Sequence, residues 1–500
     1  MKKAVVNVMI ITIVAKLLGF AKEVMLSYFF GASGISDAYL ISQTIPGIIF
    51  QFVGTGLATC FIPVYSSIAN NEGEKGANYF TNTILMIVFI FSTVIVLLVM
   101  GNTEFVVKIF AAGFQGETLK QAVFFTRIGI FSLYFSAIIY VMNSYLQMKN
   151  RFSFVAFTAV PNSIMILLSI IAGAKLEIIW LPIGSILAVF IQALFLLVMA
   201  RRESFRFSLN MDFKNHKVLE MLRLMIPVTI GVSINELNLL IDRTLASGIA
   251  VGGISALSYA ESIVMFVQGI FVQTIATVYY PALTDMVEKR DVKGTEKALQ
   301  DAMQGMFFLL IPVTIGCIVL SKDVVEILYG RGSFGQDAAQ MTSIAFGLYT
   351  LGIVGYGFRE IFSRFFYAYH DTKTPMINAA IGVGVNIIMN LTLSPIIGIG
   401  GLALATSVSS TLTAILLFIQ MHKQYGNVFE LETIVDYVKI IISAGIMGIV
   451  VYFVHTFMAI SNLYISFVMT VLSGVITYFI CVVILKVNVI KDIIKTIKKS

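Results

Sequence analysis

Long apolar runs separated by short polar stretches make up almost all of this 500-residue chain. A helix needs roughly 20 mostly apolar residues to cross a membrane, and apolar windows of that length predict fourteen helices. Their ranges are 4–30, 35–66, 78–101, 120–148, 154–173, 179–200, 218–246, 254–287, 297–320, 337–368, 375–396, 399–421, 435–458 and 462–486. A composition of 58% hydrophobic and 12% charged residues excludes a soluble globular protein. We therefore expect an all-α polytopic membrane protein without a separate soluble domain.

Loop charges predict the orientation of these helices. With the N-terminus in the cytoplasm, loops and tails on that side hold Lys and Arg in an excess of about four to one over the opposite side. Both termini are therefore expected in the cytoplasm, and the first apolar run is expected to be a retained helix rather than a cleaved signal. The net charge of +7 follows from this asymmetry, so we expect no nucleic-acid partner.

Catalytic motifs are missing from the sequence. There is no Walker A loop, no HExxH and no loop cluster of carboxylates for glycosyl or phosphoryl transfer. Cys60, Cys317 and Cys481 fall inside predicted helices without metal-ligand spacing, which favours a packing role. We expect a transporter with no catalytic residues, driven by an ion gradient, the membrane potential or downhill consumption of its substrate.

An internal repeat is indicated at an offset of 218 residues. The segment 61–65 (FIPVY) matches 279–283 (YYPAL), and 106–110 (VVKIF) matches 324–328 (VVEIL). The order of these matches predicts a duplication of six helices, and an even number of helices per copy keeps both copies in one orientation. The expected division is 1–217 for an N-terminal lobe, 218–434 for a C-terminal lobe, and 435–500 for two further helices with a basic cytoplasmic tail.

Three charges interrupt the first apolar run. Lys16 and Glu23 are seven residues apart and share a helix face, while Lys22 lies about 120° around the helix. Charges at bilayer depth cost about 2.5–3.5 kcal/mol each on insertion scales, so they usually face a protein interior or a water-filled cavity. One pair could be a structural bridge. Two cations and one acid leave a cation that suits an anionic substrate.

The seventh predicted helix carries a polar stripe of Asn235, Asn238 and Asp242. An acid with amide neighbours at bilayer depth is typical of a sodium or proton site, because hard cations prefer oxygen ligands. The alternative is that Asp242 pairs with Arg243 or with another basic group.

Later helices hold further polar sets. Glu360 and Arg364 form an i, i+4 pair in the tenth helix, and Arg359 adds positive charge suited to phosphate or carboxylate. A purely structural pair is the alternative. Asn386 and Asn390 share a face of the eleventh helix, where amides also serve as contacts between helices.

Two segments resemble signatures of a known family. Residues 15–40 (AKLLGFAKEVMLSYFFGASGISDAYL) and 358–375 (FREIFSRFFYAYHDTKTP) are similar to motifs of the MurJ/MviN family, the lipid II flippases of bacterial peptidoglycan synthesis. The resemblance implies the fold of the multidrug/oligosaccharidyl-lipid/polysaccharide (MOP) exporter superfamily. In that fold two pseudo-symmetric six-helix lobes surround a cationic cavity, and helices 13 and 14 form a groove for the lipid tail.

The resemblance also implies substrate-binding positions. The two arginines of the family's first helix match lysines here, and its following acid matches a glutamate. The second-helix arginine of some members falls on Gln51, and their eighth-helix Asp–Arg pair falls on Glu261 and Ser262. The resemblance therefore implies a less basic cavity than in those members, with tenth-helix arginines able to compensate. These positions are Lys16, Lys22, Glu23, Asp37, Gln51, Glu261, Arg359 and Arg364.

Some family members bind sodium. The resemblance therefore implies a possible sodium ion in this chain, and it implies no other cofactor. Asn390 stands where those members have an acid. The matching positions are Asp242, Asn386, Asn390, Thr406 and the carbonyl of Leu402.

The function implied is transfer of an undecaprenyl-diphosphate-linked peptidoglycan precursor, lipid II, from the inner to the outer leaflet of the bacterial cytoplasmic membrane by alternating access. The expected partners are this lipid-linked disaccharide-peptide diphosphate, membrane lipids and the cell-wall synthesis machinery. An exporter of another lipid-linked oligosaccharide, of the capsule, O-antigen or teichoic-acid type, is one alternative. An integral-membrane glycosyltransferase is a more distant one.

Overall fold

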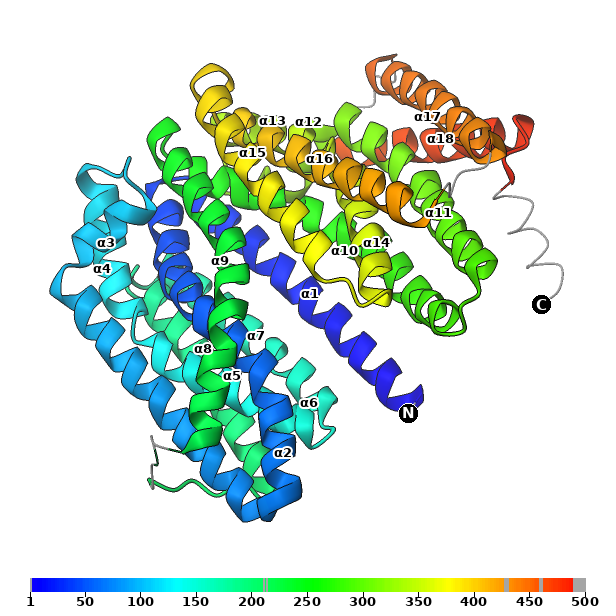
Figure 1. Ribbon diagram of the computed structural model, residues 1–500. Coiled ribbons are helices and arrows are strands. Elements are labelled where there is room, and N and C mark those ends of the chain that lie inside the picture. The colour runs from blue at the N-terminus through cyan, green and yellow to red at the C-terminus, as the bar shows by residue number, and fades with distance from the viewer. Residues whose placement is uncertain (1, 210–211, 213–214, 427–430, 458–461, 489–500) are drawn as a thin grey trace. The chain divides into compact units, whose positions relative to one another are not determined.

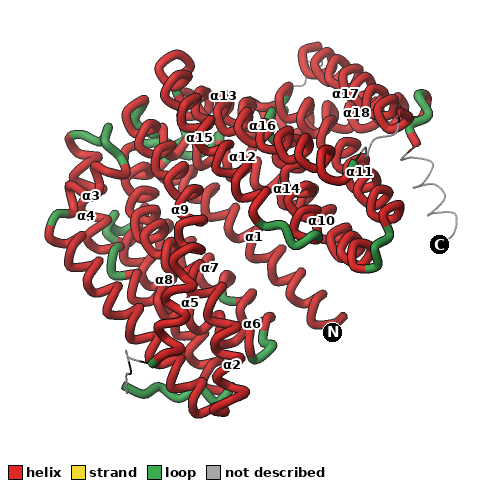
Figure 2. Tube along the Cα trace, in the orientation of Figure 1, coloured by secondary structure: helices red, strands yellow, loops and turns green. Residues whose placement is uncertain are grey.

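The computed structural model describes residues 2–209, 212, 215–426, 431–457 and 462–488. Over these residues the chain forms eighteen helices joined by short loops, with no strand (Figure 2). The expected all-α membrane fold is confirmed. The basic tail predicted at the C-terminus, residues 489–500, lies outside the described residues.

The helices pack as two compact units. Unit 1 comprises Met1–Ser255 with Gly332–Phe334, and unit 2 comprises Ala256–Arg331 with Gly335–Ser500. The helices of unit 1 are α1 (Lys2–Phe30), α2 (Gly34–Gly101), α3 (Thr103–Phe110), α4 (Gly116–Gly129), α5 (Ser132–Met148), α6 (Phe152–Phe157), α7 (Ala159–Lys175), α8 (Trp180–Arg202) and α9 (His216–Ile249). Those of unit 2 are α10 (Gly253–Glu288, whose first turn belongs to unit 1), α11 (Val292–Val319), α12 (Ser321–Tyr329), α13 (Gln336–Thr350), α14 (Ile353–Ala368), α15 (Lys373–Ile397), α16 (Ile399–Tyr425), α17 (Leu431–Phe457) and α18 (Leu463–Ile484).

The described residues of all fourteen predicted ranges are almost entirely helical, but the ranges 120–148, 154–173 and 337–368 each cover two helices. Nine helices in the described part of the chain are long and apolar enough to cross a membrane. Two bent pairs, α4 with α5 at 48° and α13 with α14 at 42°, raise that number to eleven. The total of fourteen spans stays a prediction.

Helix α2 differs from the sequence expectation. The ranges 35–66 and 78–101 were predicted as separate helices because the residues between them are polar, but α2 runs through both. Only Gly73, with φ of 72°, departs from helical geometry. A positive φ suits glycine, which has no Cβ to clash with the backbone. The two halves of α2 are thus joined by a single-residue kink.

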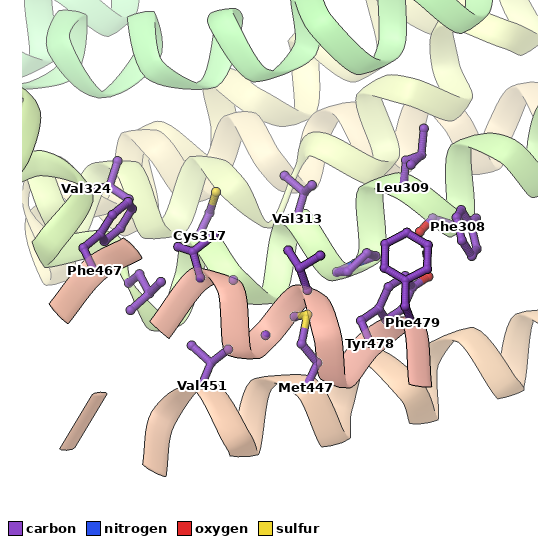
Figure 3. A pocket seen from close by; sticks show the side chains of 16 residues that line it. Phe308, Leu309, Val313, Cys317, Val324, Met447, Val451, Phe467, Tyr478 and Phe479 are labelled. Carbon is purple, nitrogen blue, oxygen red and sulfur yellow. Dashed lines mark hydrogen bonds between the residues drawn. The ribbon is translucent and has the colours of Figure 1, made fainter. Parts of the chain in front are cut away.

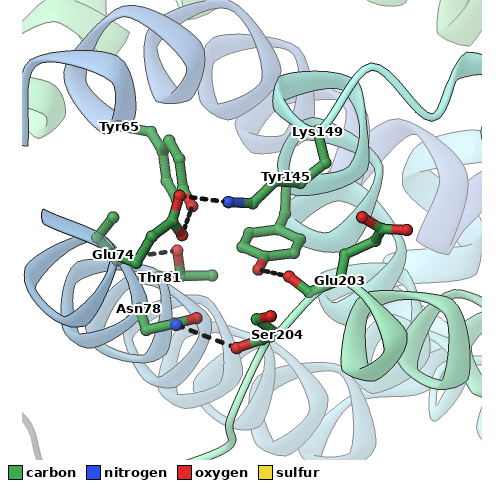
Figure 4. Close-up of polar contacts among 9 residues, drawn as sticks. Tyr65, Glu74, Asn78, Thr81, Tyr145, Lys149, Glu203 and Ser204 are labelled. Carbon is green, nitrogen blue, oxygen red and sulfur yellow. Dashed lines mark hydrogen bonds and ion pairs between the residues drawn. The ribbon is translucent and has the colours of Figure 1, made fainter. Parts of the chain in front are cut away.

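A polar tie lies beside this kink (Figure 4). The carboxylate of Glu74 accepts a hydrogen bond from the ammonium group of Lys149 at 2.6 Å. The same ammonium group lies 5.9 Å from the ring centre of Tyr65 and 5.6 Å from that of Tyr145, within cation–π range. The Tyr145 hydroxyl donates to the carbonyl of Glu203 at 2.7 Å. The tie therefore joins α2 to the ends of α5 and α8.

Unit 2 carries the last two helices on α11. α17 and α18 pack on each other, coloured orange and red in Figure 1, and α17 also packs along α11. The Tyr478 hydroxyl donates to the carbonyl of Phe308 at 2.7 Å, and His455 lies 3.4 Å from the carboxylate of Asp323 in α12. The shared core consists of Phe308, Leu320, Ile440, Ala444, Met447, Val451, Tyr478, Val482 and Val487. Helices α17 and α18 are therefore an integral part of unit 2.

Two short amphipathic helices occupy equivalent places in the predicted repeat. α3 begins at Thr103 and α12 at Ser321, which are 218 residues apart, and each follows a long apolar helix. This spacing equals the offset found in the sequence and is consistent with a duplication. The division at residues 217 and 434 stays a prediction.

Candidate substrate-binding site

The charges of α1 belong to unit 1. Lys16 is exposed, while Lys22 and Glu23 are half-buried, and the helix continues through all three. Within the described residues, neither ammonium group has a carboxylate at ion-pair distance. Glu23 does have an interaction partner. Lys16 and Lys22 are therefore unpaired cations in an apolar helix, and they are available to an anion.

Asp37 has partners within the protein. It lies in the first turn of α2, is 1% exposed, and uses both carboxylate oxygens. Oδ2 accepts from the backbone N–H of Gly252 at 2.8 Å, and Oδ1 accepts from the backbone N–H and the hydroxyl of Ser255 at 2.8 and 2.5 Å. Asp37 and Ser255 are 218 residues apart, so they are equivalent positions of the predicted repeat. In this structure the carboxylate connects the start of α2 to the start of α10.

Two further contacts also pair a segment of one predicted repeat with a segment of the other. The N–H of Gly113, after α3, donates to the hydroxyl of Ser247 at the end of α9, at 2.9 Å. Ser333, after α12, donates through its N–H to the carbonyl of Tyr28 at 2.8 Å and through its hydroxyl to that of Phe29 at 2.9 Å, both at the end of α1. We name these contacts, together with Asp37–Ser255, the clasp. All its members belong to unit 1.

Gln51 and Glu261 bring no positive charge to the site. Gln51 is exposed on α2 in unit 1. Glu261 is half-buried on α10 in unit 2 and has an interaction partner. The expectation of a less basic cavity than in other family members stays a prediction.

The two arginines of α14 differ in their surroundings. Arg364 forms the predicted ion pair with Glu360, at 2.9 Å, and also donates to the carbonyl of Ala276 at 3.2 Å and to Gln273 at 3.4 Å. Arg359 has no ion pair with any described carboxylate, and its guanidinium lies 4.9 Å from the ring centre of Tyr356. The guanidinium of Arg364 is therefore occupied by partners within unit 2, whereas the N–H donors of Arg359 are available to a ligand.

Four of the five predicted sodium ligands come together in unit 2. Asn390 donates to the side-chain oxygen of Asn386 at 2.7 Å, and Asn386 donates to the hydroxyl of Thr406 at 3.2 Å. That hydroxyl donates to the carbonyl of Leu402 at 3.1 Å. Asn386 and Asn390 are fully buried, and the group offers only neutral oxygens, a donor type that hard cations accept. Asp242 lies on α9 in unit 1.

An apolar cavity of about 290 Å³ lies among α11, α12, α17 and α18 (Figure 3). Phe308 and Val313 line it from α11, Met447 from α17, and Phe467 and Tyr478 from α18. We name it the α17–α18 cavity. Its position agrees with the groove for a lipid tail that the family resemblance implies near the last two helices.

Comparison with known proteins places the chain in a family. A family model for the lipid II flippase MurJ matches residues 26–473, which is most of the chain. The chain belongs to the lipid II flippase MurJ family. A probable lipid II flippase MurJ of Rickettsia prowazekii is 26% identical over 450 residues, covering 88% of each chain, and that of Vibrio cholerae is 27% identical over 436 residues, covering 84% of this chain and 83% of its own.

Solved structures agree with this assignment. A structure of the lipid II flippase MurJ in an inward closed conformation has a TM-score of 0.84 at 26% identity, covering 96% of this chain and 98% of the other. An inward-facing multidrug resistance MATE family transporter of the MOP superfamily has a TM-score of 0.68 at 14% identity, covering 85% of this chain, and shares the fold. The chain is thus a multi-pass inner-membrane protein of a flippase family, and the expectation of a transporter rather than an enzyme is confirmed.

Sequence reasoning missed most of the clasp. Asp37 was identified as a substrate-binding candidate, but its partner Ser255 was not, nor were Gly113, Ser247 and Ser333. The signal that could have found Ser255 was present, because this residue is separated from Asp37 by the repeat offset of 218.

Proposed function

We propose that this chain is a flippase for lipid II, the lipid-linked diphosphate precursor of peptidoglycan. The observation that carries the proposal is the presence of unpaired cations in apolar helices, Lys16 and Lys22 on α1. A diphosphate compensates such charges, which are expensive at bilayer depth without a counter-ion. Lysine acts as a compact point charge, and Arg359 offers a second cationic position with a planar fork suited to phosphate oxygens.

The lipid tail would lie outside the polar site. The α17–α18 cavity is lined almost entirely by apolar atoms, so a prenyl chain placed there keeps its surface away from water while the headgroup is transferred. Membrane lipids are the natural neighbours of the exposed apolar side chains on α17 and α18.

Transport would proceed by alternating access, from the cytoplasmic to the outer leaflet, with both termini in the cytoplasm. The loop-charge asymmetry supports this orientation. The clasp would have to open during each cycle, because its carboxylate and hydroxyl contacts connect segments from both predicted repeats. The cell-wall synthesis machinery, which consumes the precursor, is the expected protein partner.

Sodium is the proposed coupling ion. The side-chain oxygens of Asn386 and Asn390, the hydroxyl of Thr406 and the carbonyl of Leu402, all in unit 2, would hold it. Asp242 stays the acidic ligand expected from the family resemblance alone. An uptake assay in proteoliposomes with sodium replaced by choline tests this proposal, and unchanged activity without sodium would contradict it.

Complementation of a bacterium depleted of its own lipid II flippase tests the main proposal, with precursor accessible outside the cell as the readout. Wild type should rescue growth, while Lys16→Ala and Lys22→Ala should each abolish rescue at unchanged membrane abundance. Lys120→Ala, at an exposed lysine near the start of α4, is the matched control and should rescue. Normal rescue by both α1 variants would refute a diphosphate site there. Failure of wild type to rescue would favour a different lipid-linked oligosaccharide.

A further inference from the structure

A second apolar cavity lies in unit 2, outside the site described above. It measures about 470 Å³ and is lined from α11, α14, α16 and α17. Ala414 of α16 is 5% exposed at its wall, while Leu351, Ile415 and Ile434 at its edge are about half-exposed. We name it the α14–α16 cavity. Its exposed edge makes it accessible from the apolar surface of the unit rather than from water.

A row of aromatic rings follows the wall of this cavity. The ring of Tyr437 lies 4.5 Å from that of Phe307, which lies 6.0 Å from Phe358. Phe358 is stacked on Phe362 at 5.8 Å, and Phe362 lies 5.9 Å from Phe418. All five line the cavity. Together the rings form a continuous aromatic wall, and their π faces offer a chain with double bonds contacts that a saturated chain lacks.

The two cavities lie at different depths. On α17 the α14–α16 cavity is lined by Tyr437 and the α17–α18 cavity by Met447, ten residues further along. At 1.5 Å per residue this separation is about 15 Å, roughly half of the 30 Å hydrocarbon thickness of a bilayer. Phe307 and Phe308, neighbours on α11, line one cavity each. The α14–α16 cavity therefore lies nearer the start of α17 and the α17–α18 cavity further along it, with the packing of α11 against α17 between them.

An unpaired cation lies beside the aromatic row. Arg359 directly follows Phe358 and lies about 60° around α14 from Phe362, and no described carboxylate pairs with it. A lipid whose anionic head binds Arg359 can thus place its chain against Phe358 and Phe362 with little further reach. The charge of this arginine and the apolar row complement the two ends of one amphiphile.

We propose that the α14–α16 cavity is a second binding site for the polyprenyl chain of the substrate, occupied while the chain is in the leaflet where transport starts. This inference rests on the proposed function. A polyprenyl chain has a double bond and a methyl branch in every unit, so its flat segments stack on the rings from Tyr437 to Phe418. The chain moves to the α17–α18 cavity when the headgroup crosses, which requires it to pass the contact between α11 and α17.

Photo-cross-linking tests the proposal. The probe is a polyprenyl phosphate carrying a diazirine in its chain, added to the purified full-length protein in lipid nanodiscs, with labelled peptides identified by mass spectrometry. Label is expected on α14 at 358–362 and on α16 at 411–418, in addition to label on α18. Absence of label on α14 and α16 would overturn the proposal.

Variants separate the two cavities. Ala414→Phe fills the α14–α16 cavity and should reduce the label on α14 at least fivefold, while Ile419→Phe, an exposed position on the same helix, should leave it unchanged. Gly316→Leu fills the α17–α18 cavity at a glycine where an added Cβ meets no atom within 4 Å, and should reduce only the label on α18. Equal label on α14 in Ala414→Phe and wild type, both monodisperse, would overturn the proposal.

Competition identifies the occupant. Excess unlabelled polyprenyl phosphate should remove the label on α14, and an equal excess of a saturated phosphatidic acid should not. Displacement by both lipids to the same extent would mean that the cavity binds ordinary membrane lipid, contrary to the proposal. The rescue assay keeps the two proposals distinct: a wild-type chain that binds the probe in both cavities but fails to rescue would refute the flippase function alone.

Discussion

Removing the Ser255 hydroxyl from the clasp should raise the fraction of molecules in which the clasp is open. Ser255→Ala deletes the 2.5 Å hydrogen bond to Asp37 and leaves the carboxylate with two backbone donors. A hydrogen bond to a charged group contributes about 1.5–3 kcal/mol net, and 1.4 kcal/mol is a factor of ten in an equilibrium. The open fraction should therefore rise roughly tenfold or more.

A cysteine reporter in the clasp measures this fraction. Ala32→Cys places a thiol in the loop between α1 and α2, beside Gly252, in a chain whose native cysteines are replaced by serine. When opening is fast compared with labelling, the rate of modification by a membrane-impermeant maleimide follows the open population. We expect labelling about tenfold faster with Ser255→Ala than without it.

Two companion variants decide the interpretation. Asp37→Asn turns one acceptor into a donor that faces a backbone N–H, so its labelling should be at least as fast as that of Ser255→Ala. Ser144→Ala removes an equally buried hydroxyl whose partner is a carbonyl of its own helix, and should change nothing. Unchanged labelling in both clasp variants, or equal acceleration in Ser144→Ala, would refute the reasoning.

Three further predictions concern single contacts. Arg359→Gln should abolish rescue at normal membrane abundance. Arg364→Gln should instead lower the abundance and the melting temperature, because only Arg364 binds α10 and Glu360. Identical behaviour of the two variants in the rescue and melting assays would contradict this. Lys149→Met should destabilise unit 1 by about 1 kcal/mol in a melting assay, since it loses a partly exposed ion pair and two cation–π contacts; a melting curve like wild type would count against the tie. Hydrogen bonds from the hydroxyl and N–H of Thr374 and from the N–H of Lys373 hold the pKa of Asp371 below its usual 3.8. The stability that Asp371 contributes is therefore present above about pH 4 and is lost as pH falls through the lowered pKa. The difference in melting temperature between wild type and Asp371→Asn should therefore shrink from pH 7 to pH 3, and a constant difference would contradict it.

The places of the helices could be predicted from sequence because apolar length is a local property. The continuity of α2 between its two predicted halves could not be predicted, because a polar stretch does not end a helix whose side chains reach water or partners such as Lys149. The pairing of Glu360 with Arg364 followed from their spacing on one helix. Which arginine remains unpaired did not follow, because Gln273 and the carbonyl of Ala276 reach Arg364 from α10, about 90 residues away in sequence.

The contact between Asp37 and Ser255 shows what a duplication demands of its equivalent positions. Where such positions contact each other, an acid at both would bring two like charges together. In a buried setting this strongly disfavours ionisation of one of the two acids. An acid on one side and a serine on the other, whose hydroxyl and backbone N–H both donate, turn the same geometry into two hydrogen bonds, and the N–H of Gly252 adds a third. The two copies must therefore differ at this point for the clasp to close. Ser255→Asp, which restores the symmetry, should prevent closure more completely than Ser255→Ala.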